Sequence, residues 1–167
     1  EYTAKVDAAA EGEEVAQPDF SKLIKTATFE GDEESDLSDI KFFTGVDTIS
    51  LSSVPVTNEY ISSLTNLRKG YFYSCGIKDT SAFAKLDLTK IEELDLTGNE
   101  ITDWTNLNII SDKVIVANYY SIETDEEGNQ QFVPVTQTLT QYNEEQEKAA
   151  EEAENTEEAE NTEATAE

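Results

Sequence analysis

The stretch IEELDLTGNEITDW, residues 91–104, decides which fold the sequence predicts. Apolar residues stand at Ile91, Leu94, Leu96 and Ile101, and the polar Asn99 lies between the last two. This spacing matches neither the 3.6-residue period of an amphipathic helix nor the strict alternation of a half-buried strand. It is the pattern expected where a short strand ends and the chain turns abruptly out of it.

Related patterns of apolar residues recur on both sides of this stretch. The units begin, at intervals of 22, 21, 24 and 23 residues, at Ile24, Val46, Leu67, Ile91 and Val114. Each of the first four units also ends in a second apolar patch. A period of this length indicates stacked units, because one unit alone cannot bury its own apolar face. We therefore predict one short strand and one helical return segment per unit, stacked into a parallel sheet.

The two ends of such a stack need covers. Residues 114–122 and 131–139 read as two strands joined by a turn at Gly128 and Asn129. The second strand holds Pro134, which cannot donate a ladder hydrogen bond and suits a sheet edge. We predict that this strand caps the last unit. The segment PDFSKLIK, residues 18–25, is predicted to cover the first unit.

The repeated pattern resembles the leucine-rich-repeat family, and specifically its bacterial, internalin-like type. The motif LxxLxLxxNxI is matched best by IEELDLTGNEI at 91–101 and next by LRKGYFYSCGI at 67–77. The resemblance covers about residues 24–122 and is weaker in the remaining units. It implies an α/β fold: a right-handed leucine-rich-repeat solenoid with a short parallel sheet, about five repeats and a C-terminal β-hairpin cap.

Asn99 and Cys75 occupy the turn position of their units and are predicted to be structural. The turn leaves backbone groups without sheet partners, and an Asn side chain offers two donors and an acceptor for them. Cys75 fits the space but bonds weakly. It is the only cysteine, and the chain has no histidine, so neither an intrachain disulfide nor a Cys–His metal site is available.

A functional surface is predicted on the outward face of the sheet, where residues at the third, fifth and seventh positions of each unit point. Tyrosine is enriched in binding hot spots because it combines a large rigid surface with a hydroxyl group. An alternative is that these tyrosines simply favour strands. The candidate ligand-binding residues are Lys69, Tyr71, Tyr73, Glu93, Asp95, Asn118 and Tyr120.

Composition divides the chain into three parts: an acidic flexible segment over 1–19, the repeat domain with its caps over 20–142, and a Glu-rich tail over 143–167. The tail holds eleven Glu and one Lys and repeats the hexamer EEAENT. Such a segment cannot offset its ordering entropy, so we predict disorder there, with a short helix over about 141–153 as an alternative.

The net charge of −26 argues against nucleic acid and anionic membrane as partners of the domain. Without histidine the usual general base is missing, and a small solenoid offers no deep pocket, so we predict no enzyme, no cofactor and no metal. The expected role is a monomeric module that binds a protein or peptide. The resemblance implies a bacterial protein that is secreted or attached to the cell surface, for instance as a lipoprotein. The alternatives are a structural spacer, an intracellular adaptor, or carbohydrate binding.

Overall fold

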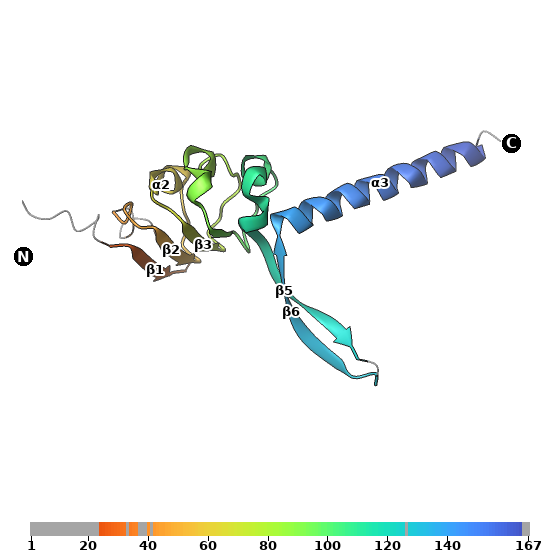
Figure 1. Cartoon of the computed structure of the whole chain (residues 1–167), viewed down its shortest axis with the longest axis horizontal. Coiled ribbons are helices and arrows are strands. Elements are labelled where there is room, and N and C mark those ends of the chain that lie inside the picture. Colours follow the sequence, from red (N-terminus) through yellow and green to blue (C-terminus); the bar gives the residue numbers. More distant parts are fainter. Residues whose placement is uncertain (1–23, 33, 37–39, 41, 126, 165–167) are drawn as a thin grey trace, which may run out of the picture.

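A computed structural model of the chain describes residues 24–32, 34–36, 40, 42–125 and 127–164. The described part is an α/β structure with one mixed sheet of six strands in chain order (Figure 1). The strands are β1 (Thr26–Glu30), β2 (Thr48–Ser52), β3 (Lys69–Tyr73), β4 (Glu93–Asp95), β5 (Val114–Thr124) and β6 (Gln130–Thr138). The helices are α2 (Asn58–Ser63) and α3 (Leu139–Ala164), with 3₁₀ helices η2 (Phe83–Lys85), η3 (Leu88–Lys90) and η4 (Thr105–Lys113).

Strands β1 to β4 run parallel and in the register that the repeat predicts. Thr26 pairs with Thr48, Thr48 with Lys69, and Lys69 with Glu93. These pairs are separated by 22, 21 and 24 residues, which are the first three intervals of the repeat. Alternate side chains of β2 and β3 are buried, as the period of two along a strand requires.

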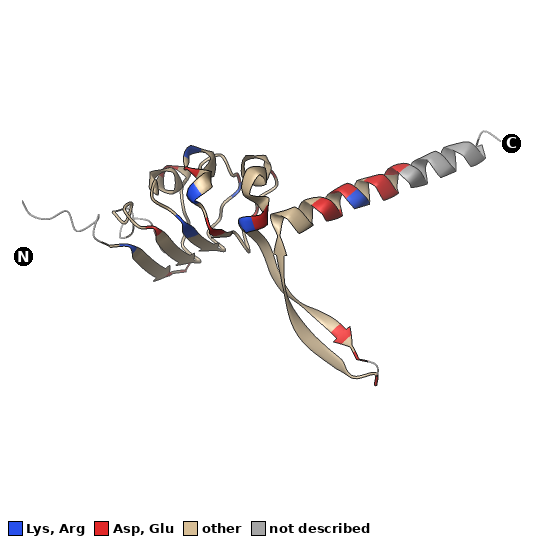
Figure 2. Cartoon of the chain, in the orientation of Figure 1, with Lys and Arg blue, Asp and Glu red and all other residues tan. Residues whose placement is uncertain are grey.

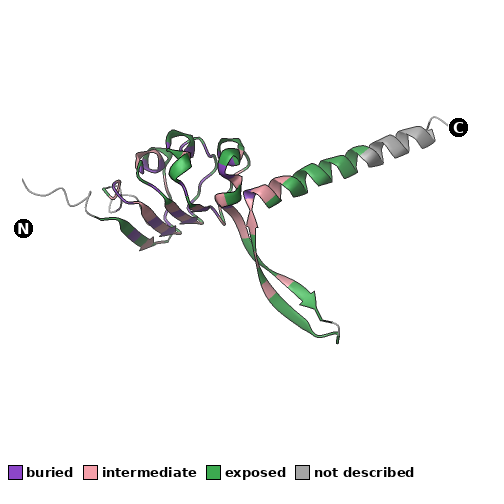
Figure 3. Ribbon diagram, in the orientation of Figure 1, coloured by how far each residue is buried: buried purple, intermediate pink, exposed green. Residues whose placement is uncertain are grey.

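The hydrophobic core lies between this sheet and the helical return segments, which cover one face of the sheet (Figures 1 and 3). Helix α2 shows how a return segment is built. It begins after Thr57, whose hydroxyl accepts a hydrogen bond from the amide of Tyr60 at 3.2 Å, and it buries Tyr60 and Ile61. The fully buried core includes Ile49, Leu51, Phe72, Phe83, Leu94 and Leu96.

The register changes at the junction of β4 and β5. Leu94 pairs with Val114, a separation of 20 residues, whereas the repeat interval of 23 predicts that Leu94 pairs with Ala117. The reason is that β5 begins directly at the end of η4, so Val114 itself fills the core position and is fully buried. Tyr119, which the repeat predicts to face the core, is 48% exposed.

The predicted leucine-rich-repeat solenoid with a β-hairpin cap is wrong. The parallel pairing stops at β5, which turns back into the antiparallel β6, so the structure is a single mixed sheet. Strand β5 has eleven residues and β4 only three, so most of the hairpin extends past the sheet and projects from the body (Figure 1). A hairpin that leaves the body cannot cover the last unit.

The chain instead closes its core with the start of helix α3. Leu139 is fully buried in the core, and the ring of Tyr142 lies 6.4 Å from that of Trp104. Helix α3 then continues to Ala164 through the tail for which composition predicts disorder. Ala and Glu have high helix propensity, and Lys148 and Glu152 form an i,i+4 ion pair. The predicted flexible segment over 1–19 lies outside the described residues, and so does the predicted cover over 18–25 except for its last two residues.

Candidate binding face

The candidate site occupies the face of the sheet opposite the helical return segments. Strand β3 alternates between Gly70 and Phe72, which are buried, and Lys69, Tyr71 and Tyr73, which are partly exposed. The rings of Tyr71 and Tyr73 stack at 6.3 Å with an interplanar angle of 23°. Two tyrosines separated by one residue share a face, so the strand period itself creates this pair.

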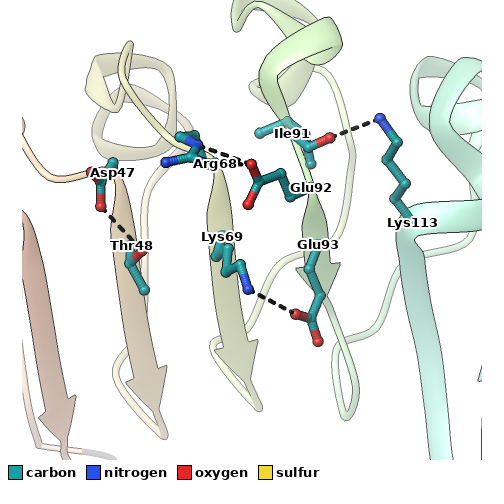
Figure 4. A network of polar contacts seen from close by, with 8 residues as sticks. All are labelled: Asp47, Thr48, Arg68, Lys69, Ile91, Glu92, Glu93 and Lys113. Atoms are coloured by element: carbon teal, nitrogen blue, oxygen red, sulfur yellow. Dashed lines mark hydrogen bonds and ion pairs between the residues drawn. The ribbon is translucent and has the colours of Figure 1, made fainter.

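Glu93 on β4 holds the first tyrosine and the lysine of this face. The Tyr71 hydroxyl donates a hydrogen bond to Glu93 Oε2 at 2.9 Å. The Lys69 ammonium lies 3.9 Å from the same oxygen, and Figure 4 marks this ion pair with a dashed line. Because Lys69 pairs with Glu93 across the two strands, the parallel register brings these groups together.

Asp95 on β4 anchors a second group of contacts. Its side chain accepts from the Thr97 amide at 2.9 Å and from Asn118 Nδ2 at 3.2 Å. Asn118 Nδ2 also donates to Thr97 Oγ1 at 3.0 Å, and Asn118 Oδ1 accepts from Thr136 Oγ1 at 2.8 Å. These bonds join β4 to β5 and β6, and we call Asp95, Thr97, Asn118 and Thr136 the polar bridge.

The polar bridge changes the predicted role of Asp95. Asp95 is predicted from the sequence to be a ligand-binding residue, but it is only 3% exposed. Its oxygens are engaged by Thr97 and Asn118 within the chain. Asp95 therefore fixes the face and does not present a free carboxylate to a ligand.

The surroundings of Tyr71 and Tyr73 raise the pKa of their hydroxyl groups. Partial burial, together with the hydrogen bond to Glu93, raises the pKa of Tyr71 to about 12. Burial and the negative charge of Asp95 also raise the pKa of Tyr73. Both hydroxyls stay neutral at physiological pH and remain able to donate hydrogen bonds.

Tyr120 is separate from the other predicted residues. It pairs with Pro134 on the projecting hairpin and is 71% exposed. No hydrogen bond or ring contact within the described residues links it to Tyr71 or Tyr73. The structure thus brings together six of the seven predicted residues and leaves Tyr120 further along the same face, two positions beyond Asn118.

Besides Lys69 and Glu93, further charged side chains lie where strands β2 to β5 begin (Figure 4). The Arg68 guanidinium bonds to Glu92 Oε1, with its Nε at 3.1 Å. Lys113 Nζ donates to the carbonyl oxygen of Ile91 at 2.9 Å. These contacts link neighbouring units across 22 and 24 residues, and sequence reasoning did not single them out.

Asn99 and Cys75 lie together at the turn that follows β4 and β3. Asn99 Oδ1 accepts from the amides of Cys75 and Ile77, both at 3.0 Å. Its Nδ2 donates to the carbonyls of Phe72 at 2.6 Å and Leu96 at 2.9 Å. One side chain thereby satisfies four backbone groups of two units, which is the kind of contact that the sequence analysis expects of it.

Cys75 is buried beneath this turn. Its thiol contacts the carbonyl oxygens of Leu51 at 3.5 Å and Tyr73 at 3.4 Å. Burial raises the pKa of the Cys75 thiol to about 11. A thiol that stays protonated and inaccessible packs as a small apolar group, so it offers no nucleophile to the face above.

Two kinds of residue on this face are not among the ligand-binding residues predicted from the sequence. Thr97 and Thr136 complete the polar bridge, and Ile122 and Phe132 are large apolar side chains exposed on the hairpin. The position of Thr136 on this face could be predicted from the hairpin register, because Thr136 pairs with Asn118. Ile122 and Phe132 carry a compositional signal, since they lie in long stretches that contain no charged residue.

Comparison of the chain with protein-family models, with curated proteins and with solved structures returned no match. The resemblance to internalin-like repeats therefore remains a prediction. Among the described residues, no three His, Cys, Asp or Glu side chains gather closely enough to hold a metal ion. None of the described helices combines the length and the apolar character that crossing a membrane requires.

Proposed function

We propose that this chain is a protein-binding module that works through the outward face of β3, β4 and the β5–β6 hairpin. One observation carries the proposal: two partly exposed stacked tyrosines share a face of the sheet with the polar bridge, which links β4 to a hairpin with exposed apolar side chains. The face is open, and its polar members are already held by hydrogen bonds within the chain.

The chemistry of the face suits a protein partner. Tyr71 and Tyr73 offer rigid aromatic area whose hydroxyls remain donors, and such side chains dominate binding energy in protein interfaces. The contacts to Glu93 restrict the Tyr71 and Lys69 side chains before binding. Restriction in the free protein lowers the entropy lost on association, so this arrangement favours affinity.

We also propose that the module is non-enzymatic and belongs to a secreted or surface-attached bacterial protein. Its cellular location rests on the resemblance of residues 67–77 and 91–101 to the internalin-like motif. Its non-enzymatic role rests on residue chemistry: the chain has no histidine, and its single cysteine is buried with a raised pKa.

A spacer role is the second candidate, and helix α3 is the observation that favours it. The helix has 26 residues, about 39 Å at 1.5 Å per residue, and its side chains over 144–154 are exposed. A rod of this kind holds apart whatever is attached at its two ends. The spacer role requires no partner on the sheet face, and this requirement separates the two candidates.

A photo-cross-linking experiment tests the binding role. A benzophenone amino acid replaces Tyr73 on the face, and in a matched control it replaces Ile109, which is 79% exposed on η4. Cells of the source organism are irradiated, and cross-linked proteins are identified by mass spectrometry. We expect a discrete partner from position 73 and none from position 109.

The partner's affinity is then measured with the double variant Tyr71→Ala and Tyr73→Ala. We expect Kd to rise at least about tenfold, because aromatic hot-spot residues typically contribute 1.4 kcal/mol or more. The control is Lys78→Ala, since Lys78 lies beyond the end of β3 and forms an exposed ion pair with Glu100. Equal affinity in the double variant and the control would exclude this face.

A further inference from the structure

The β5–β6 hairpin exposes a continuous apolar face. Tyr120 pairs with Pro134 and Ile122 pairs with Phe132, and residues opposite one another in antiparallel strands project from the same side. Tyr120 is 71% exposed, Ile122 58% and Phe132 74%. We call these three residues and Pro134 the hairpin face.

The hairpin face continues the outward face of the sheet. Asn118 is two residues before Tyr120 on β5, and Thr136 is two residues after Pro134 on β6, so all four project from one side. Asn118 and Thr136 belong to the polar bridge and contact Asp95 and Thr97 on β4. The tyrosine pair of β3 and the hairpin face therefore lie along one surface.

No described segment covers the hairpin face. Helix α3 borders the opposite side of the hairpin, where it forms a groove of about 350 Å³ lined by Tyr119, Val135, Gln137 and residues of α3. Most of the hairpin projects past β4, so no sheet neighbour lies beside its distal half (Figures 1 and 3). The fold therefore leaves the large side chains of the hairpin face more than half exposed.

The charge distribution around this face is unusual for the chain. Residues 114–122 and 128–143 contain no Asp, Glu, Lys or Arg, although 29% of the whole chain is charged. Acidic residues resume at the hairpin tip with Glu123, Asp125 and Glu127, all exposed (Figure 2). Hydrogen bonds from Asn129 and nearby amides hold the pKa of Asp125 below its usual range, so the tip stays negative.

We propose that the hairpin face binds a protein segment whose apolar side chains are flanked by Lys or Arg; this proposal rests on the binding role proposed above and names the chemistry of its partner. Interface centres are depleted of charge and enriched in aromatic residues, as this face is. The acidic tip and the net charge of −26 attract cations, and this favours a basic flank over a neutral one.

The same charges argue against the other occupants. A second copy would bring a second chain of net charge −26 and a second acidic tip to the interface. Nucleic acid and anionic membranes are polyanions and are repelled in the same way. Pro134, in the middle of the free edge strand β6, has no amide hydrogen, which disfavours addition of a further strand at that edge. The partner therefore contacts side chains of the face.

Three synthetic peptides test the proposal with the full chain: KVKVKVKVK, KSKSKSKSK and EVEVEVEVE, each fluorescently labelled and titrated by anisotropy. We expect KVKVKVKVK to bind with a Kd at least about tenfold lower than either of the other two, because it alone has both apolar and basic side chains. The triple variant Tyr120→Ser, Ile122→Ser and Phe132→Ser is expected to lose that advantage.

A matched control removes an equally exposed apolar side chain elsewhere. Ile109→Ser changes a residue that is 79% exposed on η4, outside the hairpin, and is expected to leave the Kd unchanged. Phe132→Ser alone is a second variant of the face, and circular dichroism checks that each variant is folded. Because the replaced side chains are exposed, their removal is not expected to unfold the body.

Several results would overturn the proposal. Equal binding of KVKVKVKVK and KSKSKSKSK would mean that charge alone attracts peptides, and absence of binding would leave the face without this partner. Dimerisation of the chain in sedimentation, abolished by the triple variant, would assign the face to a second copy. A benzophenone at position 132 separates this inference from the binding role: a partner cross-linked from position 73 but not from 132 overturns only the inference, whereas none from either overturns both.

Discussion

The parallel part of the sheet and the hairpin contain similar apolar side chains, but these are buried in the first and exposed in the second. In β2 and β3 the residues Ile49, Leu51 and Phe72 are fully buried, whereas Ile122 and Phe132 of the hairpin are more than half exposed. The difference is not one of residue type. The parallel strands have a layer of return segments over one face, while among the described residues most of the hairpin has neither a covering layer nor a further strand.

Strand propensity and burial are therefore separate requirements. Val, Ile, Tyr and Phe favour extended backbone in both regions. Burial depends on what lies beside the strand. Strand β5 has eleven residues and its neighbour β4 has three, so β5 is eight residues longer. Exposed apolar residues that the fold does not use are the residues available to a partner.

The same substitution in the two regions should have very different effects. Phe72 is fully buried and packs edge-to-face against Phe83 at 5.8 Å, so Phe72→Ala should lower the free energy of unfolding by about 3–5 kcal/mol. Phe132 is 74% exposed, so Phe132→Ala should change it by less than about 0.5 kcal/mol. Urea denaturation of both variants measures the difference. A comparable loss in both would show that the hairpin is packed as tightly as the body.

Asn99→Ala should produce the next largest effect. The substitution removes the partners of four backbone groups near the core, at Phe72, Cys75, Ile77 and Leu96. Unsatisfied backbone groups are costly, so we expect a loss of about 3 kcal/mol. Asn108→Ala is the control, because the Asn108 side chain accepts an exposed hydrogen bond from Asn143. Equal losses in the two variants would remove the special role of Asn99.

The sequence predicts the parallel half of this structure well, because its signals are local and repeated. The intervals between Thr26, Thr48, Lys69 and Glu93 place the first four strands, and they also place Tyr71 beside Glu93. In these units a strand begins two residues after each unit starts. The repeat therefore identifies both the core side and the outward side of each strand.

The remainder of the structure depends on contacts between residues far apart in the sequence, which the repeat does not predict. Val114 takes the core position next to Leu94, so the register slips by three residues, and the hairpin leaves the body as a result. The buried Tyr60 and the docking of Leu139 depend on which surfaces remain uncovered after the sheet forms. From the sequence, Asp95 is predicted to be an exposed acid. Its burial is evident only in the folded structure, where its carboxylate is part of the polar bridge.

For Tyr60 we predict a smaller change in the free energy of unfolding, and one of opposite sign. It is 4% exposed on α2, and its hydroxyl has no hydrogen-bond partner among the described residues. Burial without a partner raises its pKa to about 12. Tyr60→Phe removes an unsatisfied polar group and keeps the ring, so we expect the free energy of unfolding to rise by about 1 kcal/mol. Destabilisation in urea denaturation would mean that the hydroxyl has a partner after all.

The smallest effect should come from the pH dependence of Tyr71 on the binding face. Its pKa in the folded chain is about 12, because burial and the hydrogen bond to Glu93 favour the neutral hydroxyl. An unfolded tyrosine has a pKa of about 10, so the contribution to stability is complete below pH 10 and is lost between about pH 10 and 12. We expect Tyr71→Phe to show a shallower loss of stability over that range than the unchanged chain.

Glu93→Gln sharpens this test, because it keeps the size of the acceptor and removes its charge. Burial is the larger cause of the raised pKa, so Tyr71 in this variant should ionise at a lower pH than in the unchanged chain but still above an exposed tyrosine. Absorbance of tyrosinate during alkaline titration measures the shift. If the titration curve of Glu93→Gln matched that of the unchanged chain, the contact between Tyr71 and Glu93 would not persist in solution. The face would then be less organised before binding than we propose.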